Sequence, residues 1–255
     1  MDPTFRVADV PASRGVAWLR ESFRFFRTAP LQWMGLCSGW IAITLALIIV
    51  PLVGGVIANV LQPVFFASFA IAAWRQAAGE RLVMGDLFSG FRRNWRALAV
   101  VGTVLLVAEI SIFALMAWMG LPMLPSGEGG SITVGEYVEM FEGKEWILAL
   151  GFLVTVIVKG ALWFAPPLIA FHGMKAGHAM RWSAYAAIEN LGAMMVYGAA
   201  LMGLFFLGIL PYALGLLVVI PMMAISTFVG YREVFESTGD KKPGSDQGYR
   251  DAEPR

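Results

Sequence analysis

Two full charges stand inside long apolar stretches of this sequence, and their chemistry most needs an explanation. Glu109 lies 13 residues after Arg96, and Lys159 lies 13 residues after Trp146. At ~1.5 Å per residue in a helix, each charge is about 20 Å from the border of its apolar run, well inside a hydrocarbon core ~30 Å thick. A lone charge at that depth costs about 2.5–3.5 kcal/mol. We therefore expect Glu109 and Lys159 to be partners on neighbouring antiparallel helices.

This intramembrane charged pair has two interpretations, and the sequence leaves both open. It could form a site for a substrate, an ion or a proton, or it could be an ion pair that fixes how two spans pack. Five polar residues in the apolar runs are possible neighbours of such a site: Asn59, Gln62, Thr103, Ser111 and Thr155. Hydrogen bonding within or between helices is the more ordinary role for each of them.

The composition is that of a membrane protein. The chain has 255 residues, of which 58% are hydrophobic and 15% charged, and its mean hydropathy is +0.68. Soluble domains average about 45–50% apolar and about 25% charged residues. The excess apolar residues form runs of the ~20 residues that a spanning helix needs. We therefore predict an all-α, polytopic bundle of six transmembrane helices, at about 31–50, 56–74, 97–119, 146–171, 192–210 and 212–231.

The positive charges indicate an orientation. All lysines and arginines except Lys144 and Lys159 lie in the four segments on one side of the predicted spans, whereas the loop at 120–145 holds five glutamates. By the positive-inside rule, the sequence predicts a multi-pass protein of the bacterial inner membrane with both termini cytoplasmic. Several of these cations stand beside aromatic residues in interfacial segments: Arg20, Arg24, Arg27, Arg92 and Arg93. Such segments attract anionic lipids, although simple anchoring is the more ordinary role.

The sequence also indicates three copies of one unit. Each unit is a short amphipathic segment, here called an elbow, followed by two spans. The returning spans each contain a proline, Pro63, Pro166 and Pro221, which we expect to break or kink the helix. The predicted organisation is a polar arm at 1–13, a six-helix domain at 14–231 and a disordered tail at 232–255. Within the domain, the repeats cover about 14–75, 85–175 and 176–232.

Three stretches carry a resemblance to a known family. They are GVAWLRESFRFFRTAP, followed by a proline-containing hairpin, then DLFSGFRRNW, and then GYREVF near the end. With them the chain resembles an uncharacterised family of proteobacterial six-helix inner-membrane proteins. That family is distantly similar to the membrane domain of glycerophosphodiester phosphodiesterase-type proteins. The resemblance implies a fold and a location, and it implies no catalytic residues.

The sequence offers little support for an enzyme. It has no phosphate-binding loop, and its single cysteine, Cys37, and its two histidines, His172 and His178, lack partners at metal-ligand spacing. We predict no catalytic residues, no metal, no cofactor and no nucleic-acid partner. Membrane lipids are the expected partners, and any protein partner or substrate is unknown. The favoured function is a non-enzymatic, lipid-contacting or assembly role, and the alternative is a small-molecule or ion transporter that uses Glu109 and Lys159.

Overall fold

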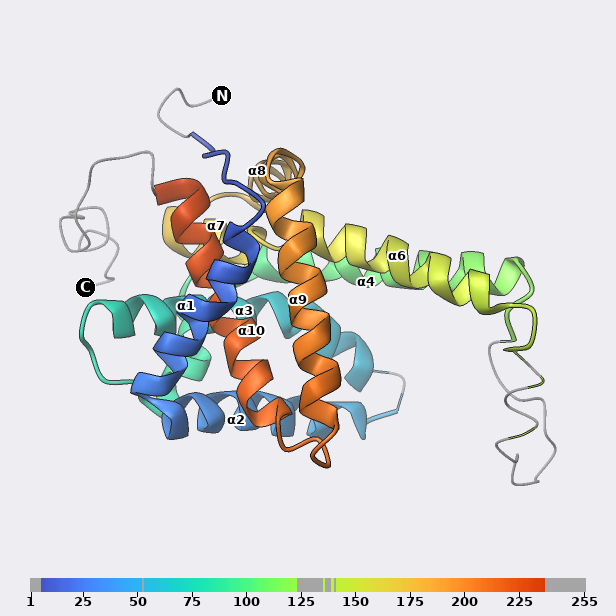
Figure 1. The fold of residues 1–255 in the computed structure, drawn as a ribbon, viewed down its shortest axis with the longest axis horizontal. Helices are drawn as coiled ribbons and strands as arrows, with labels where there is room; N and C mark the ends of the chain where they lie inside the picture. The colour runs from blue at the N-terminus through green and yellow to red at the C-terminus, as the bar shows by residue number, and fades with distance from the viewer. Residues whose placement is uncertain (1–5, 52, 123–134, 136–138, 140, 237–255) are drawn as a thin grey trace.

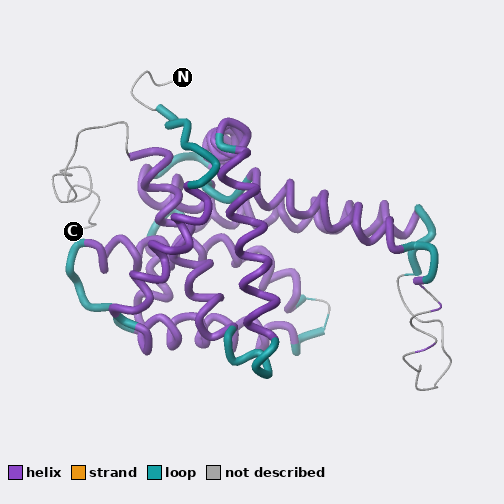
Figure 2. Tube along the Cα trace, in the orientation of Figure 1, coloured by secondary structure: helices purple, strands orange, loops and turns teal. Residues whose placement is uncertain are grey.

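The structure is a computed structural model that describes residues 6–51, 53–122, 135, 139 and 141–236. This part of the chain consists of helices and turns, with no β-strand (Figure 2). Six of its helices are long and apolar enough to cross a membrane, which confirms the predicted all-α membrane fold. They are α2 (Pro30–Ile48), α3 (Gly54–Ala77), α4 (Trp95–Trp118), the pair α6 (Glu145–Ala161) and α7 (Ala165–His172), α9 (Leu191–Ile209) and α10 (Leu216–Tyr231).

Each pair of spans follows a short elbow. The elbows are α1 (Arg14–Thr28), the 3₁₀ helix η1 (Met84–Arg92) and α8 (Ala176–Glu189). The element order is therefore elbow, outgoing span and returning span, three times in succession (Figure 1). The exact residue limits of three sequence repeats stay a prediction.

The core of the bundle consists of the returning helices α3 and α10 together with α7, the second part of the middle returning span. Burial in α3 is nearly continuous from Pro63 to Ala73, in α7 it runs from Ala165 to Ala170, and in α10 it extends to Tyr231. The outgoing spans α2, α4 and α9 are mostly exposed, as is α6 of the middle returning span, which suits helices that face lipid. Small residues in the buried runs let these helices approach closely. Close packing of this kind is what associates helices in lipid, where the hydrophobic effect does not favour contact between them.

The three elbows close this core into a ring. The elbow η1 packs on α3, α8 packs on α7, and α1 packs on α10 and α9. Each elbow thus lies against the returning helix of the preceding hairpin, and α1 joins the beginning of the chain to its last hairpin (Figure 1).

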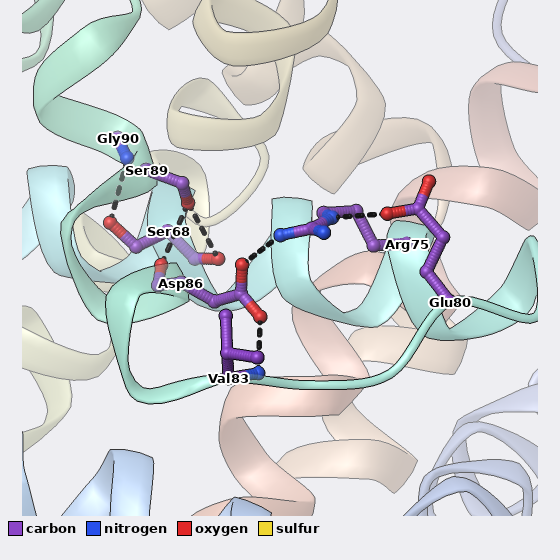
Figure 3. Close-up of polar contacts among 7 residues, drawn as sticks. All are labelled: Ser68, Arg75, Glu80, Val83, Asp86, Ser89 and Gly90. Carbon is purple, nitrogen blue, oxygen red and sulfur yellow. Dashed lines mark hydrogen bonds and ion pairs between the residues drawn. The ribbon is translucent and has the colours of Figure 1, made fainter.

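Ion pairs fasten two of these elbows. Arg75, at the end of α3, pairs with Asp86 of η1, whose side chain is 2% exposed, and also with Glu80 at 2.6 Å (Figure 3). Asp86 accepts a further hydrogen bond from the Val83 backbone at 2.8 Å, and the Gly90 backbone donates to the Ser68 hydroxyl of α3 at 2.9 Å. A buried carboxylate needs this full set of partners.

The elbow α1 is held against the last hairpin by ion pairs and hydrogen bonds to η2 (Arg232–Glu236), which continues α10. Arg14 of α1 donates to Glu233 at 2.5 Å, Trp18 Nε1 donates to the same carboxylate at 2.7 Å, and Arg232 pairs with Glu21. The bond to Glu233 raises the pKa of Arg14 above its ordinary value.

At two of the three prolines the helix does not break, and a kink at these two positions stays a prediction. Pro63 and Pro221 lie inside α3 and α10, which continue through them. These are the two most buried spans, and packing on several sides holds a helix together where a proline removes one backbone hydrogen bond. In the middle hairpin the break is real but lies earlier than Pro166. There α6 ends at Ala161, and Pro166 stands in the first turn of α7, where its missing N–H costs nothing.

The ends of the last span also differ from the prediction. The helix begins at Leu216 rather than at residue 212, because Tyr212 and Ala213 adopt left-handed φ values of 52° and 63° in the preceding turn. It extends through η2 to Glu236, five residues into the predicted tail. Residues 237–255 of that tail, and most of the acidic loop at 120–145, lie outside the described residues.

The described part of the N-terminal arm is held against the bundle. The Ala8 backbone donates to the Val234 carbonyl at 2.8 Å, and the Val10 backbone donates to Asn190 Oδ1 at 2.8 Å. Asn190 is 1% exposed at the junction of α8 and α9, and its amide donates to Ala8 at 3.0 Å. The first and last described segments therefore lie side by side, which agrees with an even number of spans.

Candidate functional site

The middle hairpin brings the two intramembrane charges together. Lys159 Nζ of α6 lies 2.7 Å from Glu109 Oε1 of α4, so the two side chains are partners. Figure 1 shows α4 and α6 side by side, extending as an arm beyond the other hairpins. The Glu109 side chain is 21% exposed and that of Lys159 is 43% exposed. The pair is therefore not enclosed in the bundle, and Lys159 is the more accessible partner.

Lys159 also lines a pocket of about 330 Å³, here called the inter-hairpin pocket. Its walls come from α3, α4, the α6–α7 region and α10, so all three hairpins contribute to it. The lining residues are Gln62, Pro63, Phe66, Leu105, Lys159, Leu162, Trp163, Pro166, Met223 and Thr227. This volume lies in the usual range for small-molecule sites, which are also mostly apolar with a few polar groups.

Two of the lining residues hold buried polar atoms that lack a hydrogen-bond partner in the described structure, namely Thr227 Oγ1 and Trp163 Nε1. The whole Thr227 residue is only 1% exposed. An unpaired buried donor typically costs about 1–3 kcal/mol. The helix offers Thr227 an easy remedy, because threonine can donate to a carbonyl one turn back. Both residues line the inter-hairpin pocket, so a molecule bound there could supply the missing partners.

The break between α6 and α7 positions Trp163. The Phe164 backbone N–H, freed by the break, donates to the Ser183 hydroxyl of α8 at 3.0 Å, and that hydroxyl donates to the Ala161 carbonyl at 2.7 Å. One serine thus satisfies the backbone on both sides of the break, as irregular backbone at membrane depth requires. The Trp163 ring packs edge-on against Tyr197 of α9, with the ring centroids 4.4 Å apart.

Of the possible polar neighbours predicted from the sequence, only Gln62 lines the pocket. The others donate to their own helix four residues back: Asn59 to Gly55, Thr103 to Ala99, Ser111 to Val107 and Thr155 to Gly151. Pro63 and Pro166 line the pocket, whereas Pro221 borders a separate small space beside α2.

The interfacial arginines lie on the elbows and do not line the pocket. Arg20, Arg24 and Arg27 are exposed along one face of α1, where the Arg27 guanidinium lies 5.9 Å from the centre of the Phe23 ring. Arg92 is exposed at the end of η1, and Arg93 is half-buried. These side chains form a basic and aromatic surface that is separate from the candidate site.

Sequence reasoning did not select Trp163 and Thr227. A usable signal existed for Trp163, which follows Lys159 by four residues and so shares its helix face. Thr227 carried no such signal, because an isolated threonine in an apolar span normally bonds to its own backbone.

The pocket is richer in donors than in acceptors. The Lys159 ammonium and the Trp163 indole can only donate, the Thr227 hydroxyl can do either, and the Gln62 amide can do both. Such a set suits a ligand that brings acceptor oxygens.

One comparison with known proteins gives a relative over nearly the full length. The chain is 27% identical to a probable inner membrane protein of Burkholderia thailandensis, over 272 aligned residues that cover 94% of this chain and 96% of the relative. No family model matches the chain, and no solved structure matches it. The relative supports the resemblance to an uncharacterised inner-membrane family and gives no link to glycerophosphodiester phosphodiesterases.

Proposed function

We propose that this multi-pass inner-membrane protein binds a small molecule in the inter-hairpin pocket and transports it, with both termini in the cytoplasm. One observation carries the proposal. The pocket is lined both by Lys159, whose side chain is 43% exposed, and by the unpartnered hydroxyl of Thr227, a residue that is 1% exposed. An unsatisfied buried group in a native structure needs an explanation, and a bound molecule that brings an acceptor would supply one. The proposal thus favours the transporter over the purely lipid-contacting role.

The positive charges at the ends of the returning helices support the proposed orientation. Arg75, Lys175 and Arg232 all stand at the elbow end of the bundle, together with the exposed arginines of α1. The positive-inside rule puts that end in the cytoplasm. Thr227 lies five residues before Arg232, about 7.5 Å along a helix, and Lys159 lies deeper. By the same count Gln62 lies 13 residues before Arg75, about 20 Å along α3, so the pocket extends from near the cytoplasmic ends of the spans past their middle.

A transport site must be reachable from water, and cysteine labelling tests this directly. In a Cys37→Ala background, Gln62→Cys should react with a membrane-impermeant thiol reagent from one side of sealed vesicles. Val107→Cys is the matched control, because Val107 is 57% exposed on α4 and does not line the pocket. We expect labelling at position 62 only. Equal protection of both positions would mean that the pocket is closed to water and would remove the case for transport.

The elbow surface supports a second function, binding of anionic lipid by α1. Arg20, Arg24 and Arg27 project from one face of that helix next to Phe23, and each cation near an anionic surface contributes about 1 kcal/mol. The triple variant with glutamine at these positions should therefore retain at least about tenfold less phosphatidylglycerol on purification. Arg81→Gln, an exposed position in the loop before η1, is the control. Unchanged lipid retention in the triple variant would contradict lipid binding by α1 and leave this helix a structural role alone.

A further inference from the structure

We infer that the pocket takes an amphiphile with one anionic head group, which Lys159 binds, and that Glu109 competes with that head group for the same ammonium. This inference rests on the proposed function and specifies its ligand. It uses three observations: the donors in the pocket, its apolar walls, and the geometry of the charged pair.

The head group must be an acceptor. Lys159 and Trp163 offer only N–H donors, and Thr227 has a hydroxyl proton without an acceptor in the described structure. A carboxylate or phosphate brings two or more acceptor oxygens and a charge opposite to that of Lys159. A cationic ligand would instead meet the ammonium, and a neutral alcohol would bring a single weak acceptor.

The rest of the ligand must be apolar. Six of the lining residues present hydrocarbon, aromatic or thioether surface: Pro63, Phe66, Leu105, Leu162, Pro166 and Met223. They come from α3, α4, α10 and the α6–α7 region, so apolar walls surround the polar group on several sides. A free inorganic anion would leave these walls uncovered, whereas an alkyl chain attached to the head group would contact them.

The charged pair makes Glu109 a competitor. Glu109 Oε1 lies 2.7 Å from Lys159 Nζ, and Glu109 is the only ion-pair partner of Lys159 in the described structure. An ammonium has three donors, so Lys159 can face the pocket while still bound to Glu109. The carboxylate nevertheless neutralises the charge that attracts the head group. Removing the charge of Glu109 should therefore strengthen ligand binding, even though it removes a contact of the folded protein.

The binding test uses the full-length protein in nanodiscs of zwitterionic phosphatidylcholine. Octanoate and octyl phosphate are the probes, and octanol, octyltrimethylammonium and inorganic phosphate are the controls. The readout is the temperature at which the buried Cys37, the single cysteine and 3% exposed, becomes reactive. We expect the two octyl anions to raise that temperature saturably and the three controls to leave it unchanged. An equal effect of octanol or of the octyl cation would overturn the inference.

Lipid head groups and free amphiphiles share this chemistry, and a second nanodisc preparation separates them. Discs that contain phosphatidylglycerol should abolish the effect of octyl phosphate if the anionic lipid itself occupies the pocket. An undiminished effect identifies a free amphiphilic anion as the ligand. Both results retain the anionic amphiphile and differ only in its source.

Binding of octyl phosphate to single variants then tests which side chains contact the head group. Lys159→Met should weaken binding of octyl phosphate about 10- to 100-fold, the loss expected for a hydrogen bond to a charged group. Glu109→Gln should tighten it. Thr227→Val should weaken binding and yet stabilise the ligand-free protein, because it removes an unpaired buried hydroxyl. Thr103→Val is the control, since Thr103 already donates to Ala99 and lies outside the pocket.

Unchanged affinity in Lys159→Met would overturn the inference. Its failure can be distinguished from failure of the proposed function. If Gln62→Cys is labelled from water but no octyl anion binds, the transport site stands and the ligand class is wrong. If Gln62→Cys is protected, the transport site itself is wrong.

Discussion

Replacing Gly15 with alanine is expected to detach α1 from α9 and to destabilise the whole bundle. A Cβ atom at position 15 would lie 2.3 Å from the Ala193 carbonyl oxygen and 2.6 Å from the Tyr197 nitrogen. Both are backbone atoms of α9, so no side-chain rotation can relieve the overlap, and one helix must move. Overpacking typically costs about 1–3 kcal/mol, and we expect the upper end of that range because the contact is between backbones.

The consequence extends beyond the contact itself. Gly15 stands next to Arg14 and three residues before Trp18, whose side chains both donate to Glu233 at the end of the last hairpin. A displaced α1 would therefore also lose the contacts that close the ring of hairpins. Gly90 occupies a similar place in η1, where a Cβ atom would lie 2.3 Å from the Val64 carbonyl oxygen of α3. Gly90→Ala should show the same effect at another elbow.

Heat-induced exposure of Cys37 measures this loss, since Cys37 lies on α2 and becomes reactive when the bundle opens. Gly198→Ala and Gly203→Ala, both on α9, are matched controls because no atom lies within 4 Å of a Cβ at either position. Alanine in place of glycine favours a helix intrinsically by about 1 kcal/mol, so the controls should be neutral or stabilising. If Gly15→Ala behaves like them, α1 does not dock on α9 in the membrane.

This ring of contacts marks the limit of what the sequence could predict about the fold. Apolar runs of about 20 residues determine spans almost by themselves, because a single segment can satisfy all its backbone groups in lipid only as a helix. The elbow at 14–28 was equally predictable, because aromatic and basic residues alternate in it. That this elbow packs on α9 and α10, more than 160 residues away, depends on surface shape at Gly15 and on the carboxylate of Glu233. Neither residue looks unusual in the sequence.

The sequence predicted the two charged residues of the candidate site, but it did not predict which uncharged polar residues line the pocket. Glu109 and Lys159 stand out because charge is rare at their depth, and their pairing follows from the hairpin. Gln62 and Thr103 look alike in the sequence, yet one lines the pocket and the other bonds to Ala99. Whether a hydroxyl or amide is satisfied depends on rotamers and neighbours that no spacing rule describes. Thr227 was missed for that reason.

Breaking the charged pair from its two sides should have unequal effects. Lys159→Met leaves Glu109 without a counter-ion at 21% exposure, whereas Glu109→Gln leaves Lys159, which is 43% exposed and lines the pocket. An uncompensated charge deep in a membrane costs about 3 kcal/mol. The lysine should lose part of that cost, because its long side chain lines the pocket and can extend toward a polar region. We therefore expect Lys159→Met to lower the level of folded protein in the membrane more than Glu109→Gln does. The reverse order would show that Glu109, and not Lys159, is the partner that tolerates the loss of its counter-ion.

The exchanged double variant, Glu109→Lys with Lys159→Glu, separates packing from binding. If the pair serves only to join α4 and α6, the double variant should restore both the level of folded protein and binding of octyl phosphate. If Lys159 binds an anionic head group, folding should recover while binding is lost, because a carboxylate then lines the pocket at position 159. Folded protein is measured by protection of Cys37, and binding by the shift that octyl phosphate produces in the same assay. A pair used only for packing should work equally well in both orientations. A lysine that binds an anion in the inter-hairpin pocket should work only at position 159.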